Sequence, residues 1–283
     1  MVADYDRTTT LEWCRRIDAG PFASVAVGER VTFRNQEQLV MLAAAAALTS
    51  RVRVVATIVI LPMHAVPLVA KQAATLDVLS GGRLTLGVGV GGREHDYRAA
   101  NAAFGRRLPR LDEGVEALRR LWAGEVPFAG ADPVGPRPVQ PGGIPILCSS
   151  LGPKSLARAA TWADGLVGFT LAGDAADLSA TADRVRAAWQ GAGRETPPYL
   201  MTTAWFSLGE GAPDRHRRYV ADYLAIDPVL APLMVDAAAI HSAPALVRAL
   251  DNAEAAGFDE FVLVPTTSDL VELDRVEAVL AAR

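Results

Sequence analysis

Short apolar runs alternate with longer amphipathic segments along almost the whole chain, and this alternation limits the possible folds more than any other feature. The apolar runs are rich in β-branched residues and nearly continuous in hydrophobicity, as in parallel strands covered on both faces. They predict seven strands, at 22–27, 52–61, 83–88, 144–148, 165–169, 199–207 and 260–264. The amphipathic segments predict helices at 11–18, 36–48, 67–79, 108–122, 154–163, 175–190, 215–225, 245–256 and 269–282. We therefore expect an α/β protein with a parallel sheet.

The number of strands decides between the parallel architectures. A (β/α)8 TIM barrel fits a chain of 283 residues without a composition break; a doubly wound sheet is the alternative. The first of the eight strands is predicted to be missing or truncated, because residues 1–6 are too few and too polar to supply it. The gap would leave unpaired strand edges. We expect it to be filled either by residues that precede Met1 in the natural protein or by a segment of a partner.

The prediction is a single domain over residues 1–283. One segment interrupts the pattern: residues 124–143 hold five prolines and five glycines, which excludes a helix and disfavours a strand. This excursion is expected to be a lid, an extended cover of one face or a simple surface loop. Just before the strand at 83–88, Asp77, Ser80 and Arg83 are expected to stabilise a glycine turn by bonding one another and its backbone.

Composition excludes several classes of function. The net charge is −4, which argues against nucleic-acid binding through phosphate neutralisation. The longest apolar stretch, 54–70, is interrupted by Pro62, His64 and Pro67, so we expect no membrane helix. The two cysteines, Cys14 and Cys148, lie far apart, which argues against a disulfide scaffold or a zinc site and predicts a cytoplasmic protein.

A glycine run follows the predicted strand at 83–88. Gly87, Gly89 and Gly92 satisfy the G-x-G-x-x-G pattern of dinucleotide-binding folds. That interpretation fails on context, because no second strand ending in an acidic residue follows the run. What remains is a set of glycines at the carboxyl end of a strand, which lets a ligand approach the backbone and leaves N–H groups for an anion.

The segment 77–83 (DVLSGGR), followed by 86–92 (LGVGVGG), resembles the central motif of the bacterial luciferase-like monooxygenase superfamily. Further segments match the family's pattern, at 27–30 (VGER), 49–52 (TSRV), 67–72 (PLVAKQ) and 163–165 (ADG). Within the superfamily the chain is most similar to F420-dependent oxidoreductases. One departure is Arg30, which stands where the family often has a histidine, so a proton-transfer role is not expected at that position.

The resemblance implies a (β/α)8 barrel that binds the deazaflavin F420, or alternatively FMN, at its C-terminal face. It implies a bulge with a non-proline cis peptide near residues 58–59. The cofactor ring is expected against Glu29, Ile58, Val59, Val90 and Gly91. Contacts to the phosphate and tail are expected from Ser150, Leu151, Gly152 and Thr170. Hydride chemistry belongs to such a cofactor, while the protein positions it and excludes water. No metal site is expected.

His64 and Glu29 are the candidate catalytic residues. His64 directly follows the predicted strand at 52–61, and an imidazole with an ordinary pKa near 6.5 suits a general acid or base. A role as a loop bystander is equally compatible with its position. Glu29 follows the strand at 22–27. In a barrel both side chains lie at the same mouth.

Three functions follow from these observations. The leading one is an F420-dependent oxidoreductase that moves a hydride to or from a small organic substrate. The second is a monooxygenase that uses oxygen and reduced FMN, with the reduced FMN supplied by a separate flavin reductase. For the first function, an F420 reductase would supply the reduced cofactor. The third is a flavin-binding barrel without turnover. We also expect a homodimer, because the helix at 36–48 contains five consecutive alanines, Ala43–Ala47, and such a face allows close approach of a neighbouring helix.

Overall fold

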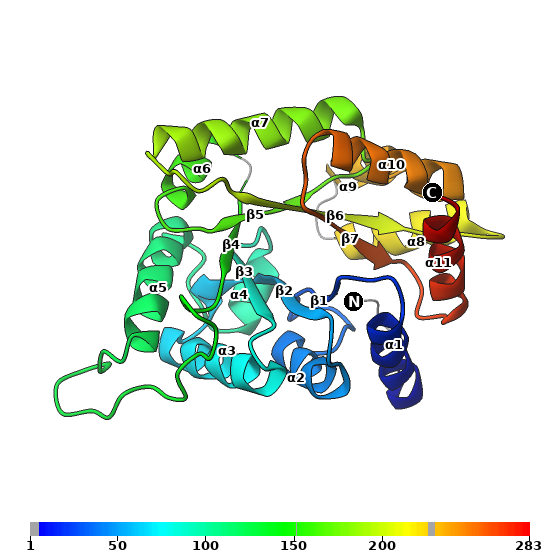
Figure 1. Cartoon of the computed structure of the whole chain (residues 1–283). Helices are drawn as coiled ribbons and strands as arrows, with labels where there is room; N and C mark the ends of the chain where they lie inside the picture. Colours follow the sequence, from blue (N-terminus) through cyan, green and yellow to red (C-terminus); the bar gives the residue numbers. More distant parts are fainter. Residues whose placement is uncertain (1–5, 151, 226–229) are drawn as a thin grey trace.

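The computed structural model describes residues 6–150, 152–225 and 230–283. Over these residues the chain forms a nearly closed barrel of parallel strands surrounded by helices (Figure 1). The strands follow one another in chain order within a single seven-stranded sheet. Their bounds are β1 Ser24–Val27, β2 Arg53–Val59, β3 Leu84–Gly89, β4 Ile146–Ser149, β5 Gly165–Phe169, β6 Tyr199–Phe206 and β7 Glu260–Pro265.

Helices connect the strands and cover the outside of the barrel. Their bounds are α1 Arg7–Ala19, α2 Gln38–Leu48, η1 Leu61–Met63 (a 3-10 turn), α3 Val66–Ser80, α4 Glu94–Ala99, α5 Arg107–Trp122, α6 Pro153–Ala159, α7 Ala175–Gly191, α8 Ala212–Leu224, α9 Leu230–Ala237, α10 Ala243–Ala255 and α11 Val271–Ala282. The seven predicted strands and the nine predicted helices are all found, most of them with shifted ends. The short elements η1, α4 and α9 were not predicted, because they are too short to show a periodic pattern.

Local chemistry explains where several helices begin and end. The Asp6 carboxylate accepts a hydrogen bond of 2.7 Å from the Thr9 backbone N–H and so caps α1. The Ser242 hydroxyl caps α10 in the same way. Gly81 ends α3 with a left-handed φ of 66°, a conformation that favours glycine. These ends set the lengths of the connections that return the chain to the next strand.

The barrel interior is filled by side chains from most of the strands. Its buried layer contains Val55, Leu147, Val167, Met201 and Val262. A larger apolar layer lies between the sheet and the surrounding helices, and it packs α2, α3 and α5 against β1–β4. The barrel is therefore a packed core, and a ligand has access to its ends rather than its centre.

The barrel wall has one gap. The strand ladder runs from β1 to β7, and among the described residues no ladder joins β7 back to β1. The helix α1 precedes β1 in the chain and lies over this gap beside α11, to which Arg16 is joined by a 2.5 Å ion pair with Asp274 (Figure 1). The prediction of a TIM barrel without its first strand is thus confirmed for the described residues.

The excursion at 124–143 is anchored at the amino-terminal end of the barrel. The buried Asp77 carboxylate accepts hydrogen bonds from the Val139 N–H at 2.7 Å and from the Gln140 side chain at 2.6 Å. The Lys71 ammonium donates to the Gly135 carbonyl at 2.8 Å. Since Asp77 lies at the turn that enters β3, this anchor is at the face opposite the carboxyl ends of the strands. Residues 139 and 140 of the excursion are therefore held away from the mouth.

The expected turn network around Arg83 is present and wider than predicted. The Ser80 hydroxyl accepts from the Arg83 N–H at 3.1 Å. The Arg83 guanidinium donates to the carbonyls of Ser80, Val52 and Thr49 and so joins the ends of α2, β2 and α3. Asp77 contributes its backbone carbonyl to this turn, while its carboxylate binds the excursion instead.

We expect Asp77→Ala to detach the excursion, because the Val139 N–H and the Gln140 side-chain amide lose the carboxylate that accepts their hydrogen bonds. The free energy of unfolding should fall by about 2 kcal/mol. Urea denaturation followed by circular dichroism measures this change. Asp132→Ala, at an exposed position in the same excursion, is the matched control and should be neutral. Equal stability of the two variants would contradict the anchor.

Candidate active site

A cavity of about 420 Å³ opens at the carboxyl ends of β2, β3 and β4. Its floor and one wall are apolar, and the other wall is formed by α5, α6 and the loop between β4 and α6. The lining residues are Ile58, Val90, Gly91, Gly92, Leu108, Leu111, Asp112, Cys148, Ser149, Ser150, Gly152, Ser155, Arg158, Ala159 and Trp162. A mostly apolar cavity with a few convergent polar groups is the usual form of a small-molecule site.

The glycine run after β3 shapes the floor of this cavity indirectly. A Cβ atom at Gly89 would lie 2.3 Å from Cδ1 of Ile58, and one at Gly91 would lie 2.9 Å from Cδ1 of Ile60. These glycines therefore make room for two isoleucines of the neighbouring chain segment, a role that the sequence did not reveal. Gly92 is different, because a Cβ atom there would meet nothing within 4 Å. Gly92 is the glycine that leaves open space for a ligand.

The end of β2 is irregular where it approaches β3. The register between the two strands shifts between Ala56 and Val59, and the Thr57–Ile58 peptide bond is cis. The bulge and the non-proline cis bond fall where the family resemblance implied them, with the cis bond one residue earlier. Ile58 turns toward the cavity, whereas Val59 is buried in the core between sheet and helices.

Hydroxyl groups gather at one end of the cavity. Ser149, Ser150 and Ser155 line it, and none of their hydroxyls donates to or accepts from another part of the chain that the structure describes. Arg158 lies beside them and forms a 3.0 Å ion pair with Asp112. The Asp112 carboxylate also accepts from the Trp162 indole N–H at 3.1 Å. Free hydroxyls next to a guanidinium can bind a phosphate group.

Glu29 and His64 meet at the same mouth. His64 Nε2 lies 2.6 Å from Glu29 Oε1, and Glu29 Oε2 accepts from the Ile60 N–H at 2.6 Å. The side chain of Glu29 is 9% exposed and that of His64 is 32% exposed. The hydrogen bond to Glu29 raises the pKa of His64, against the opposing effect of burial, and the charges of Glu29 and Glu37 add to the rise. The pair thus favours a protonated imidazole held by a carboxylate.

The Glu29–His64 pair lies next to the cavity but is not part of its lining. Neither Glu29 nor His64 lines the cavity, but Ile60 connects the two places. Its N–H binds Glu29, and its side chain packs where Gly91 has no Cβ atom. A substrate that extends from the cavity past Ile60 would reach the imidazole.

Arg30 has a structural role at the mouth. Its guanidinium lies between the rings of Phe33 and Tyr223, 4.1 Å from each centroid, and donates to the Tyr223 carbonyl at 2.7 Å. Arg93 donates to the same carbonyl at 3.2 Å. These contacts hold the loop after β1 against α8.

Apart from Glu29, His64 and Val59, which are described above, the predicted site residues fall into three groups. Those that line the cavity are Ile58, Val90, Gly91, Ser150 and Gly152. Thr170 is buried and its hydroxyl accepts from the Gly173 N–H at 3.0 Å, so the structure shows it in a turn. Leu151 lies outside the described residues. The roles of all of these toward a cofactor stay predictions.

Sequence reasoning missed the contribution of α6 and the segment after it. Ser155, Arg158 and Trp162 line the cavity at helical spacing, directly after the predicted loop at 150–152. That spacing on the first helix after a strand end was a usable signal. Within the described ranges, no group of three or more His, Cys, Asp or Glu residues is arranged to hold a metal ion. Among those same residues, no helix has the length and apolar character needed to cross a membrane.

Comparisons with known proteins identify the family and the fold. The family model described as luciferase-like monooxygenase matches residues 4–260. The uncharacterized protein Rv0953c of Mycobacterium tuberculosis is 34% identical over 215 residues, which cover 68% of this chain and 74% of that protein. Pyrimidine monooxygenase RutA of Cronobacter sakazakii is 32% identical over 180 residues, which cover 59% of this chain and 52% of RutA.

Solved structures share the fold. The F420-dependent secondary alcohol dehydrogenase in complex with an F420–acetone adduct has a TM-score of 0.82 at 20% identity, covering 98% of this chain and 95% of that one. Monooxygenase RslO1 from Streptomyces bottropensis has a TM-score of 0.77 at 24% identity, and the match covers 97% of this chain and 91% of that one. The resemblance predicted from residues 77–92 is confirmed.

We expect Glu29→Gln to lower the pKa of His64, because the carboxylate that favours the imidazolium is removed while burial still disfavours it. Since the folded-state pKa is raised, the pair stabilises the fold below the unfolded pKa of about 6.5, and this contribution is lost as pH rises through the folded pKa. NMR titration of the His64 ring measures the shift. A titration midpoint that does not move in the variant would show that the pair is not coupled.

Proposed function

Because this chain belongs to the luciferase-like monooxygenase family, we propose that it is an oxidoreductase that binds F420 at the barrel mouth and transfers a hydride to or from a small organic substrate. The observation that carries the proposal is the buried Glu29–His64 pair beside an apolar cavity with free serine hydroxyls at one end. The pair would provide proton transfer, and the cavity would provide a place for a flat ring and a phosphate.

The residues present fit such a cofactor. The ring would lie against Ile58, Val90 and Gly92, since Gly92 leaves open space where a side chain would stand. Ser150, Ser155 and Arg158 would hold the phosphate. When bound, the deazaflavin supplies the hydride donor or acceptor. The apolar wall formed by Leu108 and Leu111 excludes water from that face.

His64 would move the proton that accompanies the hydride. When a carbonyl is reduced, its oxygen requires a proton, and a protonated His64 can donate one from Nδ1, because Nε2 faces Glu29. Glu29 keeps the imidazole charged and oriented, because its second oxygen is fixed by the Ile60 N–H. In the reverse direction the neutral imidazole accepts the proton of an alcohol. This is general acid–base catalysis in both directions.

A second candidate is a monooxygenase that uses reduced FMN. The observation that favours it is the 32% identity to pyrimidine monooxygenase RutA over 180 residues. In that case a separate flavin reductase would supply the reduced cofactor, and His64 would act on an oxygenated substrate. A cytoplasmic location suits either function, and both cysteines are free thiols in the structure.

Titration of the apo-protein with F420 and with FMN, followed by fluorescence, tests the proposal and separates it from the second candidate. Gly92→Val should weaken binding of the preferred cofactor by at least about tenfold, because a side chain would enter the cavity without a clash in the protein. Gly191→Val, at an exposed position away from the cavity, is the control. If neither cofactor binds, the oxidoreductase proposal fails.

We expect His64→Ala to slow single-turnover hydride transfer by about 100-fold or more while leaving the cofactor Kd nearly unchanged. The reason is that His64 lies beside the cavity and not in its lining. Stopped-flow absorbance of the reduced cofactor measures the rate. His95→Ala, at an exposed position on α4, should retain the parental rate. A parental rate in His64→Ala would make His64 a bystander.

We propose a homodimer in which α2 and α3 form the contact. Val40 on α2 is 69% exposed and Leu68 on α3 is 55% exposed, so this side of the barrel carries apolar side chains next to the alanines of α2. Val40→Arg should convert the dimer to a monomer in light scattering, since it places a charge in an apolar contact. Leu233→Arg, equally exposed but on α9, should stay dimeric. A monomeric parent protein would refute the contact.

A further inference from the structure

Two arginines meet at the barrel mouth beside α8. Nη1 of Arg30 and Nη1 of Arg93 both donate to the Tyr223 carbonyl, at 2.7 and 3.2 Å. Among the arginines and lysines that the structure describes, Arg30 alone is buried, with 8% of its surface exposed, and the side chain of Arg93 is 16% exposed. Burial lowers the pKa of the Arg93 guanidinium, and the positive charge of Arg30 lowers it further. We call Arg30 and Arg93 the arginine pair.

A single carboxylate of the described residues forms an ion pair with the arginine pair. Asp96 is fully buried, and its Oδ2 atom lies 3.6 Å from Nε of Arg93. Its Oδ1 atom accepts hydrogen bonds from the N–H and the hydroxyl of Thr32. Arg30 forms no ion pair with a carboxylate of the described residues. Two guanidinium charges therefore have one carboxylate between them, and a positive charge is left over at the mouth.

Each member of the arginine pair also has an unused donor. Nε of Arg30 and Nε of Arg93 are both buried, and neither donates a hydrogen bond within the described residues. The faces of the Arg30 guanidinium are covered, because it lies between the rings of Phe33 and Tyr223. Its N–H groups lie at its edge, in the plane of the group, so a ligand binds it only there. A carboxylate accepts hydrogen bonds from a guanidinium in that plane.

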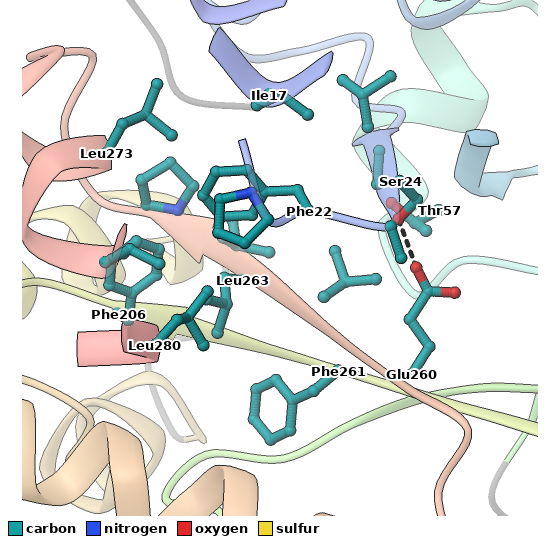
Figure 2. A pocket seen from close by; sticks show the side chains of 18 of the residues that line it. Ile17, Phe22, Ser24, Thr57, Phe206, Glu260, Phe261, Leu263, Leu273 and Leu280 are labelled. Carbon is teal, nitrogen blue, oxygen red and sulfur yellow. Dashed lines mark hydrogen bonds between the residues drawn. The ribbon is translucent and has the colours of Figure 1, made fainter. Parts of the chain in front are cut away.

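Two carboxylates elsewhere in the barrel show the contrast. Glu272 is fully buried and lies 2.9 Å from Nη1 of Arg275. Glu260, beside the cavity of about 560 Å³ at the gap in the barrel wall, accepts from the Ser24 hydroxyl (Figure 2) and from the Arg53 guanidinium. These charges are balanced by partners within the chain, whereas the arginine pair keeps both positive charge and hydrogen-bond donors for a ligand.

The arginine pair lies next to both parts of the proposed site. Arg30 directly follows Glu29, which holds His64. Arg93 directly follows Gly92, which lines the cavity. A substrate that lies between the cavity and the imidazole would therefore have positive charge beside it.

Aromatic rings extend from the arginine pair across the mouth. The Tyr223 ring contacts Phe33 and Trp205 edge-on, with centroids 5.4 and 5.3 Å apart. Trp205 in turn contacts Phe169 at 4.6 Å, and these two residues lie at the carboxyl ends of β6 and β5. Phe33, Tyr223 and Phe169 are half-buried, so part of each ring can contact a ligand. The apolar body of a small molecule, an aromatic ring above all, packs well on such a surface.

We propose that the substrate of this oxidoreductase is an organic acid, whose carboxylate binds the arginine pair and whose apolar part lies on the rings of Phe33 and Tyr223. The inference rests on the proposed function, because it names the class of substrate for that site. The carboxylate is a separate group from the carbonyl or alcohol that reacts at His64. It would balance the remaining charge and accept from the unused N–H groups, so the arginine pair would select substrates by charge.

Benzoate serves as the probe, and benzamide, which has the same ring and no charge, is its neutral counterpart. NMR titration of the apo-protein should show benzoate binding at least about tenfold more tightly than benzamide, since hydrogen bonds between two charged groups are the stronger ones. Rising salt should weaken benzoate binding and leave benzamide binding unchanged. Equal affinities for the two probes would overturn the proposal.

Arg93→Gln should weaken benzoate binding by at least about tenfold, because it removes one charge of the arginine pair. Benzamide binding and the circular dichroism spectrum should stay as in the parent, which excludes a general loss of structure. Arg93→Lys keeps the charge and should lose less affinity than Arg93→Gln does. Arg98→Gln, at an exposed position on α4, is the matched control and should bind both probes like the parent. Parental benzoate binding by Arg93→Gln would refute the role of the pair.

Fluorescence titration with F420 and with FMN distinguishes a failure of this proposal from a failure of the proposed function. Arg93→Gln should bind the preferred cofactor as tightly as the parent does. If it loses affinity for the cofactor together with affinity for benzoate, the arginine pair holds an anionic part of the cofactor, and the substrate proposal is overturned. If the parent binds neither cofactor, the proposed function fails, and a loss of benzoate binding in Arg93→Gln would still support a site for organic acids.

Discussion

The close approach of β2 and β3 is the constraint on which the mouth of this barrel depends. Gly87 and Gly89 have no Cβ atoms where the Ile58 side chain lies, and Gly91 has none where Ile60 lies. This packing fixes the chain just after β2, and the Ile60 N–H then holds one oxygen of Glu29 at 2.6 Å. The other oxygen holds His64. The Glu29–His64 pair is thus positioned through glycines in β3 and just after it, none of which contacts either side chain directly.

The elements of the fold were predictable because the strands are covered on both faces. A strand such as β5, Gly165–Phe169, reads as an uninterrupted apolar run, and its predicted and observed bounds agree. Ends were less predictable where tertiary contacts decide them. The predicted strand at 52–61 stops at Val59, because the register shift and the turn η1 follow, and neither leaves a periodic signal.

The place of the candidate site in the fold was predictable, whereas the contacts made by its residues were less so. Glu29 and His64 were each expected at strand ends, and a parallel barrel brings such ends together. The glycine run was expected to open the backbone to a ligand, but Gly89 and Gly91 instead accommodate isoleucines, and Gly92 has the open space. Such a distinction depends on which side chain faces each glycine across the sheet. A single sequence does not contain that pairing.

The gap in the barrel wall and the Glu29–His64 pair share one strand. Val27 at the end of β1 lines the cavity at this gap, and Glu29 follows two residues later. Across the described residues β1 is paired with β2 on one side only, so the carboxylate stands at the end of an edge strand. Edge strands open more readily than strands paired on both sides. The position of the Glu29 carboxylate therefore depends on its contacts with the Ile60 N–H and with His64, more than on the pairing of its own strand.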